Sequence, residues 1–439
     1  MSEEFHAIDC IFAQTICPED LPAQAILSKL LHGVRLGKLS LALSKNEEMI
    51  AKRLPKEHCV VNEGELYLAR HFESKSQIMH HLKRLQTTQK ENGFKPEQLA
   101  SYTLAPKQRE AVWHALSKPL TFISGGPGSG KSYTAAILLQ VAATKLKVVA
   151  TAPTGKACAR LRSLLEGIDC DVQTLHSLLA IGRKSRVTRL DFDLVLMDES
   201  AMVDVRLFQQ LLGALKNGAQ LVCVGDRDQL PPVEGASLFS ELMTSHIQDA
   251  VQLKGSHRTE NKEILELAAK AKGGEPFDAE PLPSVNGLVE MVLEETKKAN
   301  KLSIAEQVHF YANYKVLTPL RRGAYGADQL NAKVMERATG PIPIMMTTND
   351  HEKLLYNGDC GLLCGQDVHF GDGRIFKLWQ LGPYTPAYFM SVHKSQGSEY
   401  ERVVLLLPPG SERFGSEVIY TAITRAKKKI QIFGNKNKI

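Results

Sequence analysis

The apolar residues of this chain gather in short continuous runs that are separated by longer segments with helical spacing. Between residues 102 and 254 four such runs lie at 120–124, 148–152, 194–198 and 221–225. Apolar runs of this length without polar alternation are typical of strands that are buried on both faces. Because helical segments separate them, the runs predict a parallel, doubly wound sheet and therefore an α/β fold.

The second half of the chain repeats this pattern and then departs from it. Strands are expected at 314–317, 403–407 and 430–433. Between about 340 and 385 the sequence changes to short alternating runs with Gly and Pro, which predict a small β-barrel inserted into the second block. The fold class is therefore α/β with two parallel sheets and one small inserted barrel.

Residues 1–98 carry no catalytic motif and read as a small α-rich domain. Apolar spacing predicts helices at 21–33 and 74–85, and the segment 60–68 predicts a hairpin that turns at 62–64. A chain of 439 residues is too long for one core. The predicted domains are residues 1–98, 99–254 and 255–439.

Composition and charge narrow the class of protein only slightly. The chain is 43% hydrophobic and 23% charged with a net charge of +6, which permits a polyanionic partner without requiring one. Its basic clusters, at 183–189 and 427–438, are each more typical of a solvated face than of a binding site. The eight cysteines lack zinc-site spacing, which indicates free thiols in a reducing compartment. The acidic start, and the lack of an apolar run near 20 residues, predict a cytoplasmic protein without membrane spans.

The most specific pattern is the segment 125–132, GGPGSGKS, which fits G-x-x-x-x-G-K-[ST] between an expected strand and an expected helix. In this context consecutive backbone N–H groups cradle phosphates at a helix N-terminus. Lys131 would reach the β- and γ-phosphates, and the Ser132 hydroxyl would bind Mg²⁺. A glycine-rich surface turn is the alternative, which the flanking strand and helix disfavour. The pattern predicts binding of a nucleoside triphosphate.

Acidic and amide side chains follow two other expected strands. Asp198 stands where P-loop NTPases hold Mg²⁺, and Glu199 is placed to activate the attacking water. Gln229 could orient that water and contact the γ-phosphate, although a plain β-turn explains its segment equally well. Arg258 and Arg425 are candidates to stabilise transition-state charge. The alternative for the acidic pair is a solvated turn, which is uncommon at this distance from a P-loop.

Taken in order, these motifs resemble the superfamily 1 DNA helicases of the RecD type, the alpha subunit of exodeoxyribonuclease V (RecBCD). The resemblance covers residues 100–433 and implies two RecA-like domains, the second with an SH3-like barrel. It is looser over the first 100 residues. The matching segments are 105–108, 125–132, 151–157, 174–176, 198–200, 225–229, 257–258, 392–398 and 420–426.

The resemblance also implies roles for individual residues. Gln108 would read the adenine, and Arg258 and Arg425 would act as arginine fingers from the second domain. Strand movement would run 5′ to 3′. The residues implied in ATP binding, besides Gln108, are Gly125, Gly126, Pro127, Gly128, Ser129, Gly130, Lys131, Ser132 and Tyr133. Those implied along the single-strand path are Pro153, Thr154, Thr174, His176, His393 and Ser395.

The expected function is thus an ATP- and Mg²⁺-dependent DNA helicase that acts on single strands and duplex ends with RecB-like and RecC-like subunits. The sequence holds no second acidic cluster of nuclease type, so nuclease activity is expected in a partner. Segment 180–192 is short, so any duplex-splitting pin must be small, and its basic residues could serve it or a solvated turn. Three alternatives stay open: a stand-alone repair helicase, an RNA helicase, and a regulatory subunit with little motor activity. The complete catalytic set speaks against the last.

Overall fold

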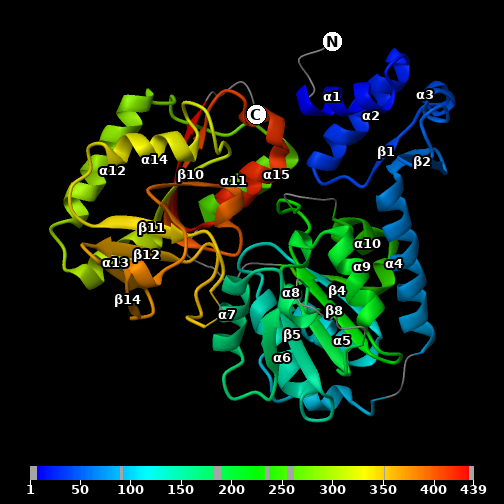
Figure 1. Cartoon of the computed structure of the whole chain (residues 1–439). Helices are drawn as coiled ribbons and strands as arrows, with labels where there is room; N and C mark the ends of the chain where they lie inside the picture. Colours follow the sequence, from blue (N-terminus) through cyan, green and yellow to red (C-terminus); the bar gives the residue numbers. More distant parts are fainter. Residues whose placement is uncertain are drawn as a thin grey trace. The chain divides into compact units, whose positions relative to one another are not determined.

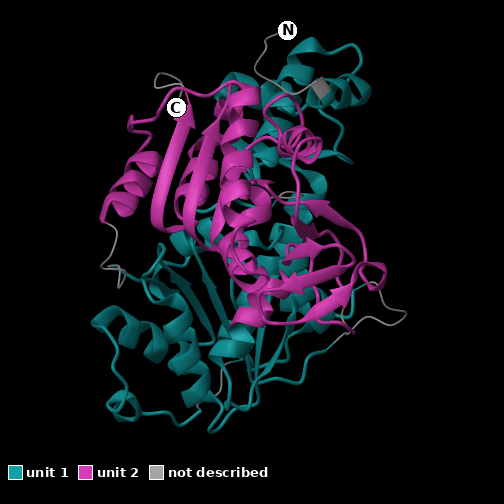
Figure 2. Cartoon of the chain, turned by 90° about the vertical axis from the view of Figure 1, so that its left-hand side faces the viewer, with its two compact units in different colours: residues 1–153, 161–255 teal, residues 154–160, 256–439 magenta. Residues whose placement is uncertain are grey.

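The structure of the chain, a computed structural model, divides into two compact units (Figure 2). Unit 1 comprises Met1–Pro153 with Leu161–Gly255, and unit 2 comprises Thr154–Arg160 with Ser256–Ile439. Each unit is built around its own parallel sheet. The residues that the structure describes are 7–88, 92–181, 189–232, 237–254, 262–350 and 352–434.

The N-terminal part of unit 1 combines helices with a small antiparallel sheet of order β1-β3-β2 (Figure 1). The predicted hairpin is confirmed, and its turn has positive φ at Glu63 (50°) and Gly64 (76°). Two successive left-handed residues match the twist of antiparallel strands, which is why an Asn-Glu-Gly-Glu sequence turns here. The elements are α1 Ala7–Ile16, α2 Leu21–Arg35, β1 Ser40–Ala42, α3 Lys45–Ala51, β2 Cys59–Asn62, β3 Glu65–Leu68 and α4 Ala69–Thr87.

Helix α4 joins this N-terminal part to the first parallel sheet. Ile78, Leu82 and Leu85 lie on one face of α4 and are at most 1% exposed. They share a hydrophobic core with Leu211 and Leu212 of α9, Val205–Ala214. Burial of side chains of this size stabilises by roughly 1.5–3 kcal/mol each. The N-terminal part and the first sheet therefore belong to one compact unit.

The sheet of unit 1 has the order β6-β5-β7-β8-β4-β9 with all neighbours parallel, which confirms the predicted parallel α/β architecture. The four predicted apolar runs form its inner strands. The edge strands β6 and β9 were not predicted, because they are short and carry polar residues. The strands are β4 Leu120–Ser124, β5 Val148–Ala152, β6 Asp171–Thr174, β7 Leu194–Met197, β8 Gln220–Gly225 and β9 Ala250–Gln252. The helices of this part are α5 Pro106–Ser117, α6 Lys131–Ala142, α7 Gly155–Leu164, α8 Leu175–Leu178, α9 and α10 Phe239–Ser245, with short 3-10 turns at η1 Pro96–Leu99, η2 Ser200–Met202 and η3 Ile247–Asp249.

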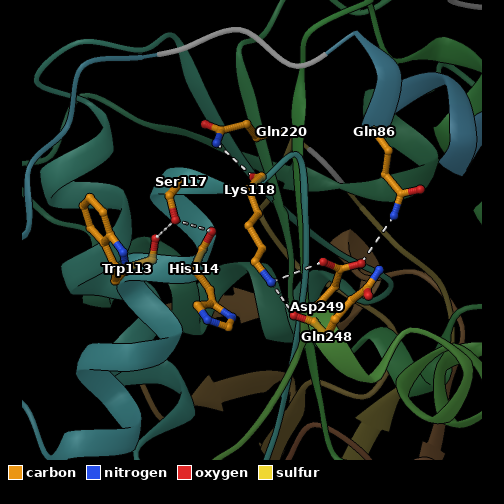
Figure 3. A network of polar contacts seen from close by, with 8 residues as sticks. All are labelled: Gln86, Trp113, His114, Ser117, Lys118, Gln220, Gln248 and Asp249. Carbon is orange, nitrogen blue, oxygen red and sulfur yellow. Dashed lines mark hydrogen bonds and ion pairs between the residues drawn. The ribbon is translucent and has the colours of Figure 1, made fainter.

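A polar network ties α4, α5 and β8 together at the amino end of the sheet (Figure 3). The buried Gln220 side chain donates to the carbonyls of Ala115, Leu116 and Lys118 at 3.0–3.3 Å. These carbonyls end α5 and lack helical donors. The Lys118 ammonium and the Gln86 amide both contact the Asp249 carboxylate. The network fixes the helix that carries Gln108.

Unit 2 contains a parallel sheet of order β16-β10-β17-β18, and the three predicted runs lie in β10, β17 and β18. Val316, Val404 and Leu406 are fully buried in its core together with residues of the surrounding helices. The strands are β10 Tyr314–Thr318, β16 Phe389–Ser391, β17 Tyr400–Leu407 and β18 Ala426–Gly434. The helices are α11 Lys262–Gly273, α12 Val285–Ala299, α13 Ile304–Asn313, α14 Ala327–Met335 and α15 Gly415–Ile423, with 3-10 turns at η5 His393–Ser395 and η6 Ser411–Phe414.

An antiparallel sheet is inserted between α14 and β16, where the alternating sequence predicted it. Its strand order is β14-β13-β12-β11-β15, so the last strand returns beside the first. Ile344, Leu355 and Val368 are fully buried in a small core of their own. The elements are β11 Ile342–Met346, β12 Cys360–Cys364, β13 Asp367–Phe370, β14 Ile375–Lys377, η4 Leu378–Gln380 and β15 Tyr384–Pro386. Closure of this sheet into a barrel, and the three-domain division, stay predictions.

Two predictions from composition can also be followed in the structure. All eight cysteines are free thiols. In the basic run at 427–429, Lys427 pairs with Glu399 at 3.4 Å and Lys428 pairs with Glu401 at 2.8 Å. These lysines thus lie beside acidic partners near the start of β17. Within the described ranges, no helix is both long and apolar enough to cross a membrane.

Candidate nucleotide and nucleic-acid site

The segments predicted to form the ATP site follow three strands that lie side by side. Ser124 at the end of β4 pairs with Gly225 at the end of β8, and Cys223 of β8 pairs with Met197 at the end of β7. Because the strands are parallel, their carboxyl ends open at one edge of the sheet, where ligands bind in open α/β folds. The structure therefore brings the P-loop, the acidic pair and the Gln229 loop to one edge.

The P-loop makes a tight turn between β4 and α6. Gly128 and Gly130 have φ of 72° and 83°, a region that glycine adopts without steric cost. The Ser129 hydroxyl donates to the Gly126 carbonyl at 2.8 Å. The Lys131 ammonium donates to the carbonyls of Gly125 and Gly126 and so lies across the loop. The first N–H groups of α6, which begins at Lys131, are left to face a ligand.

Gln108 and Tyr133 lie on either side of this loop in the sequence. The Gln108 side chain is buried, donates to the Ser129 carbonyl at 3.4 Å and accepts from the Ala105 amide at 3.0 Å. The Tyr133 hydroxyl donates to the Thr103 carbonyl at 3.1 Å, and the residue as a whole is 45% exposed. The buried amide of Gln108 is thus fixed against the loop, whereas the Tyr133 ring is available to a nucleotide.

The acidic pair forms a sharp turn at the end of β7. The Asp198 carboxylate accepts a hydrogen bond from the Glu199 backbone amide at 2.9 Å. The backbone amide of Asp198 donates to the Thr151 carbonyl at 2.8 Å. Glu199 adopts the left-handed region, with φ 51° and ψ 40°, which costs a side chain roughly 1–2 kcal/mol. Both carboxylates are half-buried. Because of this turn, the Glu199 side chain points in a different direction from the one it would have if β7 continued as a strand.

The residues present fit a magnesium ion bound together with a nucleotide. Mg²⁺ takes oxygen ligands and is usually held by one or two carboxylates plus substrate phosphates. The Ser132 hydroxyl at the start of α6 and the Asp198 carboxylate supply oxygen ligands of this kind. Within the described ranges no cluster of three or more His, Cys, Asp or Glu side chains could hold a metal alone. Phosphate oxygens would therefore have to complete the coordination.

Gln229 is held by a buried acid that sequence reasoning did not assign to the site. The Gln229 side chain donates to the Asp226 carboxylate at 3.2 Å, and Asp226 is 1% exposed. The backbone amide of Arg227, the residue after Asp226, donates to the Ser124 hydroxyl at 3.2 Å. These contacts fix the Gln229 loop beside the strand that leads into the P-loop. An acid directly after a buried strand was the signal that could have identified Asp226.

Three of the residues implied along the strand path lie in unit 1. Pro153 directly follows β5, and Thr174 is the last residue of β6. The two strands are neighbours, and Ala152, the last residue of β5, pairs with Thr174. The Thr174 hydroxyl accepts from the Ser177 amide at 3.2 Å and caps α8. His176 is exposed. Thr154 belongs by its contacts to unit 2.

The two strand-path residues of the second block lie in a turn after β16. The Ser395 side chain is fully buried, and its hydroxyl donates to the Val392 carbonyl at 2.6 Å. The buried Ser395 hydroxyl therefore stabilises the turn through this hydrogen bond. His393 packs edge-to-face on Phe414, with ring centroids 6.3 Å apart. Burial lowers the pKa of His393, which favours the neutral imidazole near pH 7.

Arg425, one of the two predicted fingers, is 4% exposed. Its guanidinium donates to the carbonyls of Thr421 and Ser398, at 3.0 and 3.1 Å, and to the Thr424 hydroxyl at 3.3 Å. The contact with Ser398 links the helix α15 motif to the 392–398 motif. In this arrangement Arg425 holds two motifs of unit 2 together. The other predicted finger, Arg258, lies outside the described residues.

We expect Arg425→Ala to lower the free energy of unfolding of unit 2 by about 3 kcal/mol, because buried carbonyls lose a charged donor. Urea denaturation measures this, and Arg413→Ala is a matched control because Arg413 is exposed in the same unit. An unchanged midpoint with lost ATP hydrolysis would contradict the structural role and assign the guanidinium to the nucleotide.

Two parallel α/β units, one of them with a P-loop, an acidic pair and a glutamine loop at the same sheet edge, define a P-loop ATPase. Comparison with protein families identifies its kind. Residues 103–290 match the AAA domain family and residues 386–432 match the UvrD-like helicase C-terminal domain. A structure of two Pif1 helicases at forked double-stranded DNA has a similar fold, with a TM-score of 0.51 and 18% identity over 77% of this chain and 94% of that one.

Curated relatives place the chain more narrowly. It is 31% identical to the RecBCD enzyme subunit RecD of Mycolicibacterium smegmatis, over 75% of this chain and 70% of that protein. It is 29% identical to RecD of Haemophilus influenzae, over 75% and 68%. The ATP-dependent RecD2 DNA helicase of Deinococcus radiodurans is 27% identical, over 92% of this chain and 59% of that protein. The chain belongs to the RecD family, and it is an ATP-hydrolysing DNA helicase.

Proposed function

We propose that this chain is the alpha subunit of a RecBCD-like exodeoxyribonuclease V that acts in the cytoplasm in repair and recombination of double-strand breaks. In this role it moves 5′ to 3′ along single-stranded DNA from a duplex end, with RecB-like and RecC-like subunits as partners. The observation that supports the motor is the meeting of the P-loop, Asp198, Glu199 and Gln229 at one sheet edge. The names of the RecD relatives support the subunit role.

In the proposed ATP cycle each residue has a separate task. The loop amides and Lys131 bind the phosphates, and Gln108 selects the adenine. Ser132 and Asp198 would hold Mg²⁺, which neutralises phosphate charge when bound. Glu199 takes the proton of the attacking water, and Gln229 contacts the γ-phosphate. Arg258 and Arg425 would add positive charge that stabilises the transition state.

Movement along DNA follows from the loss of γ-phosphate contacts on hydrolysis, a change that switches loops in other NTPases. The strand-path residues grip the backbone, so binding should depend on salt and little on sequence. Opening one DNA step costs about 1.4 kcal/mol on average. The buried Ser395 hydroxyl would act through the shape of its turn. The grip residues are Pro153, Thr154, Thr174, His176, His393 and Ser395.

We further propose that residues 1–98 form a small domain that binds the partner subunits, and that the inserted sheet closes into a small barrel. The subunit role is tested by purifying the tagged full chain from its native cell. We expect it to capture one RecB-like and one RecC-like protein in equal amounts. A chain that elutes as a monomer and unwinds DNA without loss would contradict the subunit role.

A stand-alone helicase is the second candidate. The observation that favours it is the RecD2 helicase match, which covers 92% of this chain, whereas the match to the M. smegmatis RecD subunit covers 75%. The purification experiment separates the two candidates.

A further inference from the structure

A polar cavity of about 570 Å³ lies in unit 1 between the N-terminal helix α4, the start of α9 and the segment around α8. Its volume is within the range of small-molecule sites, about 300–1,000 Å³. The cavity borders His176, a residue already implied along the strand path. The polar side chains that line it include Arg70, Glu73, His176, Asp204, Arg206 and Gln210.

The two arginines supply hydrogen-bond donors that the described residues leave unused. Arg70, at the start of α4, and Arg206, in the first turn of α9, are both exposed. Among the residues that the structure describes, neither guanidinium forms a hydrogen bond or an ion pair. A guanidinium carries five N–H donors in a planar fork that matches phosphate oxygens.

The acids at the cavity are turned toward their own helices. The Asp204 carboxylate caps α9 by accepting from the amides of Arg206 and Leu207 at 2.9 and 3.0 Å. The Glu73 carboxylate accepts from the Gln77 side chain at 3.4 Å. Neither acid lies within 4.0 Å of an arginine guanidinium nitrogen in the described part of the chain. Within the described ranges, the two guanidinium groups therefore have no carboxylate partner.

The buried His71 does not add charge to this region. Burial, together with the nearby Arg70 and Arg206 charges, lowers the pKa of His71 to about 4, and Asp204 only partly opposes this effect. The imidazole is therefore neutral at pH 7. Arg70 and Arg206 line the same cavity.

We propose that this cavity binds backbone phosphates of a nucleic-acid strand and carries the strand path from Thr174 and His176 onto helix α4. This inference rests on the proposed function, because it takes DNA as the substrate. Two guanidinium groups that have no partner among the described residues, beside an exposed histidine, match the phosphodiester backbone and provide no base-specific pattern. The N-terminal part of the chain would then contact DNA as well as partner subunits.

The test measures the affinity of the full chain for a fluorescein-labelled oligothymidylate by anisotropy over a range of salt concentrations. For Arg70→Ala/Arg206→Ala we expect roughly tenfold weaker binding near 0.1 M salt and a salt slope smaller by about 1. Lys83→Ala is the control, since Lys83 is exposed on the same helix, about 20 Å from Arg70 at 1.5 Å per residue. We expect Lys83→Ala to bind as the unchanged chain does.

A double variant with the affinity and salt slope of Lys83→Ala would overturn the proposal. A loss confined to a blunt duplex, with oligothymidylate binding intact, would overturn it as well. Arg70→Ala alone should show part of the effect, and its guanidinium makes no described contact whose loss could unfold the chain. ATP hydrolysis without DNA should stay unchanged in all variants. If the unchanged chain shows no DNA-stimulated hydrolysis, the proposed function fails instead.

Discussion

Replacement of Lys131 by glutamine should lower DNA-stimulated ATP hydrolysis by at least about a hundredfold. The ammonium is the P-loop charge that would meet the β- and γ-phosphates, and removal of one preorganised donor at a developing charge costs about 10²–10³ in rate. Among the described residues, the Lys131 ammonium donates only to carbonyls of its own loop, so the fold should survive. Phosphate release in the presence of single-stranded DNA measures the effect.

Lys107→Gln is the control for this variant. Lys107 lies at the start of α5 and forms an exposed ion pair with Glu110, which contributes little to stability. We expect its hydrolysis rate to equal that of the unchanged chain. Near-normal turnover of Lys131→Gln would refute the assignment of the P-loop as the phosphate site.

Replacement of Glu199 by glutamine should reduce hydrolysis by about 10²–10⁴-fold while ATP still binds. The amide keeps the shape of the side chain and its left-handed turn but cannot accept the proton of the attacking water. Asp198 and the P-loop, which would hold the nucleotide, are unchanged. Single-turnover hydrolysis and ATP binding, measured side by side, separate the two functions.

Glu166→Gln serves as the matched control, because Glu166 is exposed in the same unit and lies between α7 and β6, outside the predicted ATP motifs. It should hydrolyse ATP normally. If Glu199→Gln loses ATP affinity together with hydrolysis, the carboxylate holds the nucleotide and is not the general base.

The inner strands could be predicted from sequence because both of their faces are buried. Leu194, Val195 and Leu196 are each fully buried, which requires a continuous apolar run. The edge strands gave no such signal. β6 reads Asp-Val-Gln-Thr, and its Asp171 is exposed, so only its pairing with β5 identifies it as a strand.

The position of the candidate ATP site followed from sequence for a related reason. Its motifs come directly after buried strands, and parallel strands bring their carboxyl ends to one edge. The orientation of the side chains in the site could not be predicted from the sequence. That Ser395 turns its hydroxyl inward and that Arg425 binds the Ser398 carbonyl depend on tertiary contacts.

The α4 cavity was beyond sequence reasoning for a different reason. Arg70, His176 and Arg206 are far apart along the chain and belong to no common motif. The packing of α4 on α9, which share the core residues Leu82 and Leu211, brings Arg70 and Arg206 together, and His176 of α8 lines the same cavity. Sites of this kind become visible when the fold is known.

Strand displacement on 5′-tailed and 3′-tailed duplexes tests the central claim most directly. The measurement uses the chain as purified, and the chain together with any subunits that co-purify. A 5′–3′ helicase should displace the strand of the 5′-tailed duplex in an ATP-dependent manner, and Lys131→Gln should abolish this. ATP-dependent displacement from the 3′ tail alone would contradict the polarity, and no ATP-dependent displacement from either substrate would contradict the account of the chain as a DNA motor.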